Sequence, residues 1–357
     1  MMPTAPRYSA QSLAGYASAL LEKAGMPADR ASAVAETLVG GDLLGHTTHG
    51  LQLLAPYLAE IESGGMALTG EPKIVHARGA AATWDGMRLP GPWLVLKAME
   101  SAISTARSQG TASIAIRRSH HIACLETYLL RATEQGLVML LLSSDAHSKS
   151  VAPFGGTEAM FTPNPIAAGI PTGGRPILVD ISASLTTNGL TNRLHKEGRK
   201  LEHEWLIDGK GNPSDDPAVL FADPRGTILP VGGLDAGHKG YGLALIVEAL
   251  TGGLAGFGRA DPAEGWGATV FLQILDPEAF GGLDAFTRQT AWIAEGCRSN
   301  KPRSGFERVR LPGERGLDLR EKQLREGLEL YAGILESIAP WSVKLGVDAP
   351  APIRSTQ

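Results

Sequence analysis

Cysteine is scarce in this chain of 357 residues, which contains only Cys124 and Cys297. Neither belongs to a Cys-x-x-Cys pair, which argues against a disulfide framework and a zinc ribbon. Positive charge is not in excess, because the formal net charge is −4, so nucleic acid is not an expected partner. Apolar runs such as residues 137–142 are too short to cross a membrane, and residues 1–7 lack the apolar core of a signal peptide. We therefore expect a cytoplasmic protein without membrane partners.

Several signatures of nucleotide-binding proteins and hydrolases are also missing. The chain has no G-x-G-x-x-G motif, and its nearest glycine run, residues 252–258, lacks the spacing and sits at the end of an expected helix. Walker A, G-x-S-x-G and H-E-x-x-H motifs are absent as well. Any dinucleotide would therefore bind through a different arrangement of loops.

What the chain does have is an alternating pattern of helices and strands, with 43% hydrophobic and 20% charged residues. Apolar residues at helical spacing predict three N-terminal helices, and a helix over residues 318–338 that returns to pack on them. Short strands alternate with helices between these two segments, which indicates an α/β structure. The expected strands are residues 73–77, 81–85, 112–116, 137–142, 166–170, 177–181 and 269–274, and the expected helices are residues 93–108, 125–134, 239–254 and 280–297.

Two histidine-containing turns and several glycine-containing segments stand out against this background. Gly-His-Thr-Thr-His-Gly occupies residues 45–50, and Ser-His-His-Ile occupies residues 119–122. Histidine is the side chain best suited to move a proton near neutral pH, and glycine lets the backbone approach a ligand closely. Together they predict an enzyme with a large bound cofactor. The glycine-containing and polar segments are Pro-Phe-Gly-Gly (153–156), Asn-Pro (164–165), Asp-Ile-Ser-Ala-Ser (180–184) and Gly-His-Lys-Gly-Tyr-Gly (237–242).

In this order and combination, the segments resemble the malate/L-lactate dehydrogenase-like oxidoreductases, also called the type 2 or L-sulfolactate dehydrogenase-like family. The resemblance is strongest to the hydroxycarboxylate dehydrogenase subgroup, and it runs from the first histidine turn to Leu-Pro-Gly-Glu at residues 311–314. It implies a non-Rossmann, mixed-sheet NAD(P)-binding α/β domain over residues 71–317, and a helical domain formed by residues 1–70 and 318–357. It also implies a homodimer that transfers a hydride between NAD or NADP and a 2-hydroxy or 2-oxo acid, or alternatively a cyclic imine.

The resemblance assigns the catalytic acid/base to His121, and it favours His49 as a second histidine that orients the substrate or shares the proton. It places Thr48 and Leu53 at the substrate. Many relatives carry an arginine at the position of Leu53, where it can hold a substrate carboxylate, and a lysine at the position of Leu190. The apolar residue at Leu53 favours a substrate that is larger or more apolar than malate.

The cofactor contacts are expected on the loops and at one helix start. Lys239 begins a predicted helix, and a helix N-terminus offers free N–H groups and a positive dipole end to a phosphate. Asp180 can accept hydrogen bonds from a ribose or a carboxamide, or equally cap the segment that follows it. Asn164 can instead fix a turn, and Pro-Gly at residues 312–313 is also a common turn. The complete set of predicted cofactor contacts is Gly155, Asn164, Asp180, Ile181, Ser182, His238, Lys239, Pro312, Gly313 and Glu314.

A metal-dependent hydrolase or lyase is the alternative from another class of enzyme. Its site would combine His46, His49, His120 and His121 with Asp42 or Glu126. No known metal-ligand spacing is present, and the glycine-containing loops would have no role in such a site, so we predict no metal ligand. The sequence leaves open the choice between NAD and NADP and the identity of the substrate.

Overall fold

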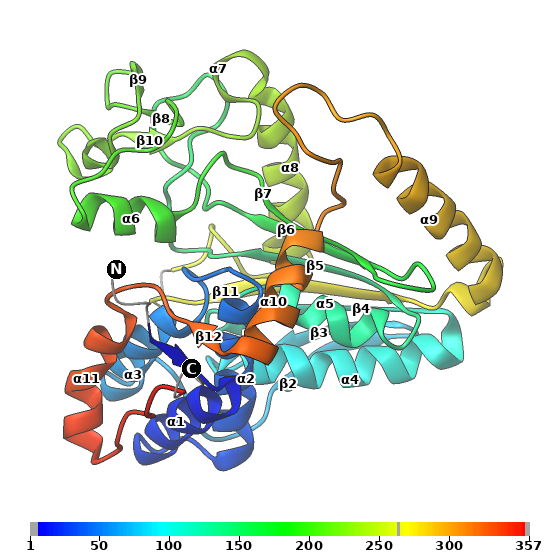
Figure 1. The fold of residues 1–357 in the computed structure, drawn as a ribbon, viewed down its shortest axis with the longest axis horizontal. Helices are drawn as coiled ribbons and strands as arrows, with labels where there is room; N and C mark the ends of the chain where they lie inside the picture. The colour runs from blue at the N-terminus through cyan, green and yellow to red at the C-terminus, as the bar shows by residue number, and fades with distance from the viewer. Residues whose placement is uncertain (1–5, 263–264, 354–357) are drawn as a thin grey trace.

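A computed structural model gives the fold of the chain and describes residues 6–262 and 265–353 (Figure 1). Two of the sequence predictions extend beyond the described part. The segment expected to lack a signal peptide includes residues 1–5, and the predicted helical domain includes residues 1–5 and 354–357. None of the described helices combines the length and the apolar character that a membrane crossing would require.

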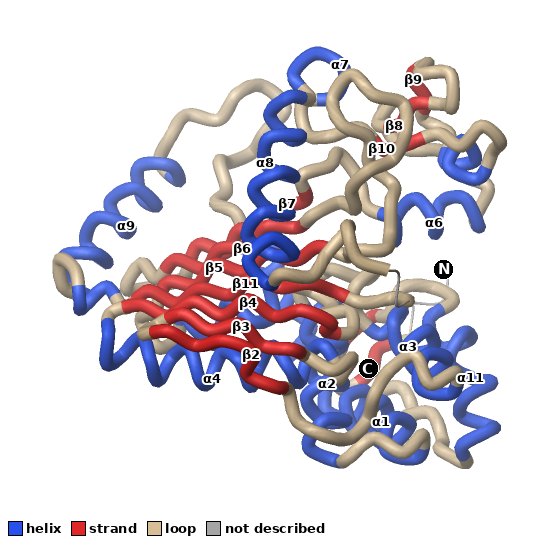
Figure 2. The backbone as a smooth tube through the Cα atoms, turned by 180° about the vertical axis from the view of Figure 1, so that it is seen from behind, coloured by secondary structure: helices blue, strands red, loops and turns tan. Residues whose placement is uncertain are grey.

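A mixed sheet of seven strands forms the centre of the described structure (Figure 2). Its strands, in spatial order, are β2 (Lys73–Arg78), β3 (Ala81–Asp85), β4 (Thr111–Ser119), β11 (Ala268–Leu275), β5 (Val138–Ser144), β6 (Pro165–Ile170) and β7 (Ile177–Ser182). Only the β3–β4 pair is parallel, and every other pairing in this sheet is antiparallel. The predicted α/β class with a mixed sheet is therefore confirmed.

Helices cover both faces of this sheet. The helices α4 (Gly91–Gln109) and α5 (Glu126–Thr133) pack on one face, and α8 (His238–Glu248), continued by a π-helical turn over Ala249–Gly253, lies on the other. β5 contributes to both sides, because Met139 and Leu141 belong to the core under α4 and α5, whereas Leu142 packs with Val247 of α8. This alternation is the two-residue period of a strand buried on both faces.

The N-terminal and C-terminal segments share a second core. Their elements are β1 (Arg7–Tyr8), α1 (Ala10–Lys23), α2 (Ala28–Leu43), the 3₁₀ turn η1 (Leu51–Leu53), α3 (Leu54–Glu62), α10 (Glu314–Glu326), β12 (Leu328–Glu329) and α11 (Ile334–Leu345). The Ser9 side chain caps α1, as the sequence predicted, and α11 packs on α1 and α3. The expectation that the tail returns to the N-terminal helices is therefore confirmed.

The expectation of one continuous helix over residues 318–338 is wrong. Gly327 has a φ of 91° and Gly333 a φ of 87°, a region that interrupts a right-handed helix. Between them the chain forms β12, which pairs with β1. The tail is therefore two helices joined by a short strand.

A third core holds the upper lobe of the molecule in Figure 1. The lobe contains α6 (Asn188–Lys196), β8 (Leu206–Ile207), β9 (Pro213–Ser214), a 3₁₀ turn (Pro217–Phe221), β10 (Thr227–Ile228) and α7 (Gly233–Ala236). The sequence did not predict α6 or these two-residue strands. Beyond the lobe, after a 3₁₀ turn over Pro277–Ala279, α9 (Leu283–Arg298) extends along the outside of the sheet.

Candidate active site

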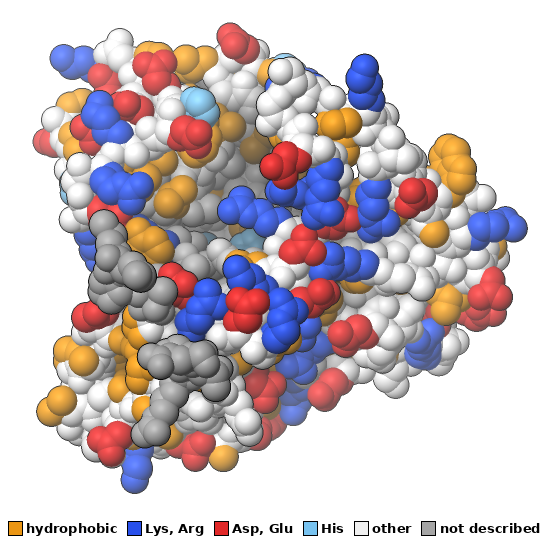
Figure 3. Space-filling model, in the orientation of Figure 1, with side chains coloured by type: hydrophobic (Ala, Val, Ile, Leu, Met, Phe, Trp, Pro, Cys, Tyr) orange, Lys and Arg blue, Asp and Glu red, His pale blue; other side chains and the backbone are white. Residues whose placement is uncertain are grey.

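A cavity of about 1170 Å³ lies between the upper lobe and the rest of the molecule. Figure 3 shows the surface hollowed in this place. All three cores contribute walls: the histidine turn from the helical unit, the strand ends of β4, β5 and β7 from the sheet, and α6 from the upper lobe. The lining side chains on which the following paragraphs depend are His46, Thr48, His49, Gln52, Leu53, His121, Cys124, Asp180, Ile181, Ser182, Arg193, Lys196, Trp266 and Tyr331.

His121 lines this cavity just after β4, and Tyr57 of α3 holds its ring from behind. The Tyr57 hydroxyl lies 2.9 Å from Nδ1 of His121 and donates to the His121 carbonyl oxygen at 3.1 Å. Nδ1 also lies 3.3 Å from the Ala123 N–H. In the tautomer that carries its proton on Nδ1, the Tyr57 oxygen accepts that proton while its hydroxyl donates to the carbonyl, and Nε2 is left as the proton acceptor. The Trp266 ring lies 4.9 Å from the His121 ring and limits its rotation. His121 is thus a fixed imidazole that can present Nε2 to the cavity.

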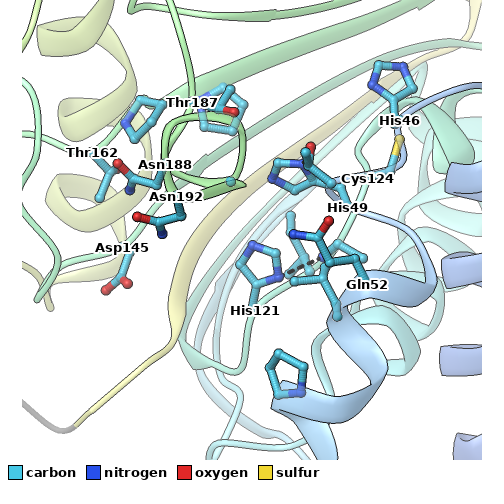
Figure 4. Close-up of a pocket in the computed structure, with 18 of the residues that line it drawn as sticks. His46, His49, Gln52, His121, Cys124, Asp145, Thr162, Thr187, Asn188 and Asn192 are labelled. Carbon is cyan, nitrogen blue, oxygen red and sulfur yellow. Dashed lines mark hydrogen bonds between the residues drawn. The ribbon is translucent and has the colours of Figure 1, made fainter. Parts of the chain in front are cut away.

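Burial lowers the pKa of His121 well below its ordinary value, and the neighbouring His49 and His120 lower it further. His49 stacks on His121 with ring centroids 5.8 Å apart, and the Thr48 hydroxyl lies 3.0 Å from Nδ1 of His49. Burial, followed by His46 and Arg193, lowers the pKa of His49 to about 4. Both histidines are therefore neutral at neutral pH, which is the form of a proton acceptor. Figure 4 shows the two rings in the same cavity.

The other two histidines support the walls. His120 is fully buried, packs edge-on against Tyr57, and lies 3.4 Å from a Glu60 carboxylate oxygen. Burial lowers the pKa of His120 to about 3. Burial also opposes the charged form of His46, but the 2.6 Å hydrogen bond to Glu126 and the charges of Asp180 and Glu126 together outweigh it, and the pKa of His46 is raised.

The metal site considered from the sequence is not what the structure assembles. Within the described residues, the group with metal-ligand spacing is His46, Cys124 and Asp180, whose ligand atoms lie within 4.8 Å of one another. His46 in that group is bonded to Glu126, and Asp180 accepts the Glu126 backbone N–H at 3.0 Å. The four histidines do not converge, so the hydrolase alternative loses its proposed ligand set. The absence of a metal ligand remains a prediction.

The structure brings some of the predicted site residues to the cavity wall. His121, His49, Thr48 and Leu53 line it around the histidine turn, and Asp180, Ile181 and Ser182 line it at the end of β7. Burial raises the pKa of Asp180, and the charge of His46 opposes this shift. These seven roles remain predictions, but their placement suits them.

The remaining predicted cofactor contacts do not line this cavity. His238 and Lys239 are exposed at the start of α8, where that helix meets α7 at the far end of the upper lobe, and Gly155 lies in an exposed turn. Asn164 is fully buried behind the wall with a φ of 48°, and its side chain donates to Glu248 at 2.9 Å. This arrangement fits the alternative reading of Asn164 as a residue that fixes a turn.

The segment Pro312–Gly313–Glu314 lies beside β7 rather than in the cavity wall. The Leu178 N–H donates to the Pro312 carbonyl at 3.2 Å, and a Cβ on Gly313 would come within 2.6 Å of the Leu178 Cβ. The Glu314 carboxylate accepts a hydrogen bond from Arg298 at 2.5 Å. The segment therefore lies outside the lining of this cavity, and its cofactor role remains a prediction.

Sequence reasoning missed several lining or supporting residues. Tyr57, Gln52, Trp266 and Arg193 carry no motif that marks them. Tyr57 falls among the buried residues of α3, where the sequence predicts only a helix, and Arg193 lies on the helix that the sequence did not predict. The one available signal for Gln52 was its place three residues after His49.

Comparisons with known proteins agree with this architecture. The malate/L-lactate dehydrogenase family model matches residues 8–339. Malate dehydrogenase from Pyrococcus horikoshii is 31% identical over 337 residues, 92% of each chain, and its solved structure superposes with a TM-score of 0.87 over 96% of this chain and 97% of that one. Hydroxycarboxylate dehydrogenase B from Escherichia coli K12 is 30% identical over 97% of this chain and 96% of its own length.

An imine-reducing enzyme shares the same fold. The structure of delta1-piperideine-2-carboxylate reductase from Pseudomonas syringae matches with a TM-score of 0.80 and 28% identity, over 94% of this chain and 99% of that one. With the family model covering nearly the whole chain and several relatives matched end to end, this protein belongs to the malate/L-lactate dehydrogenase family of oxidoreductases, whose members use nicotinamide cofactors.

Proposed function

We propose that the protein catalyses reversible hydride transfer between NAD or NADP and a 2-hydroxy or 2-oxo acid, with His121 as the acid/base. The observation that carries the proposal is the Tyr57-supported imidazole of His121 in the cavity wall. Oxidation of an alcohol needs a group that accepts the hydroxyl proton, and reduction needs the same group to return it.

The cavity suits a dinucleotide together with a small substrate. Its volume of about 1170 Å³ exceeds what a short 2-oxo acid fills, and its wall carries the polar groups Asp180 and Ser182 along one side. When bound, the nicotinamide supplies or accepts the hydride. Asp180 and Ser182 would hold the cofactor through its polar groups, and His49 and Thr48 would face the substrate.

His121 can gain a proton without leaving its position. A protonated imidazole donates from both nitrogens, and the Tyr57 hydroxyl oxygen can accept the Nδ1 proton while donating to the His121 carbonyl. Because the pKa of His121 is lowered, the neutral acceptor prevails at neutral pH, which suits alcohol oxidation. Reduction draws on the protonated form and is therefore expected to accelerate as the pH falls.

A cyclic imine is the second candidate substrate, favoured by the structural match to the piperideine-carboxylate reductase. We further propose that the cofactor binds without a Rossmann fingerprint, which the antiparallel pairings of β11 support. The division into a helical domain (1–70 and 318–357) and an NAD(P)-binding domain (71–317) also remains a proposal, supported by the separate core of the terminal helices. The free cysteines Cys124 and Cys297 fit the proposed cytoplasmic location.

We also propose a homodimer formed through α8 and α9. Both helices carry exposed apolar side chains: Leu245 and Ile246 on α8, Trp292 and Ile293 on α9. Apolar patches of this kind commonly mark protein interfaces.

A substrate panel tests the reaction class. The purified protein is assayed with 2-oxo acids of increasing side-chain size and with cyclic imines, using NADH and NADPH separately. Oxidation of the reduced cofactor that depends on a 2-oxo acid supports the proposal. Turnover of imines alone would select the second candidate, and no turnover with either class would contradict both.

A further inference from the structure

A carboxylate in this cavity needs a positive charge to bind, and few lining groups supply one. His49 and His121 are neutral at neutral pH, and His46 is already paired with Glu126 at 2.6 Å. Among the described lining residues, Arg193 and Lys196 of α6 carry the remaining positive charges. Lys196 is exposed, whereas Arg193 is half-buried. Leu53, which lines the same cavity, provides no charge.

Arg193 has no carboxylate partner within salt-bridge distance among the described residues. The nearby Glu197 is bonded instead by the Tyr331 hydroxyl at 2.6 Å and by Arg199 at 2.8 Å. The acceptors around the Arg193 guanidinium are neutral: the Thr47 hydroxyl at 2.9 Å, the Thr47 carbonyl at 3.1 Å and the Gln52 amide oxygen. A partly buried cation with only neutral acceptors is a favourable place for an anion.

The orientation of the guanidinium matches what a carboxylate requires. Its Nε and Nη2 atoms both donate to the single amide oxygen of Gln52, with Nε at 3.1 Å. That edge of arginine binds the two oxygens of a carboxylate through parallel hydrogen bonds. The Tyr331 ring lies 3.8 Å from Arg193 Cζ and fixes the plane of the group. Gln52 faces the same cavity as His49 and His121 (Figure 4).

We propose that Arg193 binds the carboxylate of the 2-oxo acid, and that this carboxylate displaces the Gln52 amide oxygen from the Nε and Nη2 edge. The proposal rests on the function proposed above. It makes Arg193, which reaches the histidine turn from the upper lobe, the determinant that selects acids over their neutral analogues. Since Thr47 lies two residues before His49, whose ring stacks on that of His121, the anchored carboxylate would lie near this pair of histidines.

The test compares a 2-oxo acid with its methyl ester, using the full-length protein and reduced cofactor. For Arg193→Met, we expect kcat/KM for the acid to fall roughly 10- to 100-fold, because a charge-assisted pair is lost, while the ester changes little. The preference for acid over ester should collapse accordingly. Affinity for NADH or NADPH, measured by fluorescence, should stay within about threefold of the wild type. Lys196→Met, which removes a charge three residues away on the same helix, should keep the preference.

Three results would overturn the proposal. Equal losses of kcat/KM for acid and ester in Arg193→Met would mean that Arg193 only holds the upper lobe against the histidine turn. Loss of the preference in Lys196→Met would transfer the role to Lys196. If Arg193→Met does not fold, Gln52→Met is the second variant, because it leaves the Nε and Nη2 edge of Arg193 without its neutral acceptor. A rise of about 10-fold or more in KM for the acid in Gln52→Met would contradict the displacement of the Gln52 oxygen by the substrate carboxylate.

The proposed function and this inference can fail separately. A wild type that reduces neither the acid nor any imine with either cofactor contradicts the proposed function. Calorimetric titration of the acid and the ester into the protein with reduced cofactor still decides the role of Arg193, because selective acid binding that is lost in Arg193→Met needs no turnover.

Discussion

At the scale of single residues, the chemistry depends on one imidazole and its support. His121→Ala should lower kcat by about 10²–10⁴, the usual contribution of a positioned acid/base. Affinity for the reduced cofactor should remain nearly intact, because Asp180 and Ser182, which we propose to hold the cofactor, line the cavity at the end of β7 and not beside β4. Single-turnover kinetics and fluorescence titration measure the two quantities. A variant that keeps more than about a tenth of wild-type turnover falls outside that range and would favour His49.

Tyr57 is a positioning residue, and it should affect the titration of His121 more than the affinity for substrate. Tyr57→Phe removes the oxygen that accepts the Nδ1 proton, so the protonated imidazole becomes less stable. The pKa seen in the pH profile of kcat should therefore fall, and the rate of reduction should fall about 10-fold with KM little changed. If the pH profile of kcat for Tyr57→Phe keeps the wild-type midpoint, or if only KM changes, Tyr57 only fills the core.

At the scale of elements, the join between α2 and the histidine turn should make stability depend on pH. Asp42 is buried beneath Gly50; its Oδ2 accepts the Leu51 N–H at 2.7 Å, and its Oδ1 has no hydrogen-bond partner within the described part of the chain. Burial, opposed by the Leu51 hydrogen bond and the Arg193 charge, raises the pKa of Asp42 from 3.8 to about 7. The folded state therefore binds more protons than the unfolded state between these values. The stability that Asp42 contributes is fully present below pH 3.8, and this contribution is lost as the pH rises through 7.

Asp42→Asn should consequently become more stable relative to the wild type as the pH rises from 5 to 8. Over this range the change in the unfolding free-energy difference should be at most about 3 kcal/mol, the equivalent of the roughly two pH units between pH 5 and the raised pKa. Urea unfolding at several pH values measures it, with Glu100→Gln on the exposed face of α4 as the matched control. If the difference in unfolding free energy between Asp42→Asn and the wild type does not change with pH, the pKa of Asp42 is not raised by folding.

The elements also show how far the sequence alone could lead. Strands such as β5 and helices such as α1 were predictable, because their apolar period and the Ser9 cap are local signals. α6 was missed because its few apolar residues, Leu190 and Leu194, pack into a lobe whose strands are two residues long. Lys239 does start a helix as predicted, but local sequence cannot tell that this helix start lies at the far end of the lobe.

At the scale of the whole molecule, association should depend on α9. Trp292 is 75% exposed, and placing a charge there should weaken the proposed dimer. For Trp292→Asp we expect sedimentation to give a dimer dissociation constant at least about 10-fold higher than that of the wild type. Val343→Asp, at an 85% exposed position on α11, is the control and should sediment as the wild type does. A monomeric wild type would contradict the dimer itself.

The cavity walls come from three separate cores, and this links ligand binding to the cooperativity of unfolding. His49 belongs to the helical unit, Ser182 to the sheet and Arg193 to the upper lobe, yet all three line one cavity. A ligand that touches all of them is released as soon as any one core melts, so its binding energy is shared by every core. We expect calorimetric scans without ligand to show separate melting steps for the cores. At saturating cofactor and substrate analogue, these steps should merge into a single sharp transition.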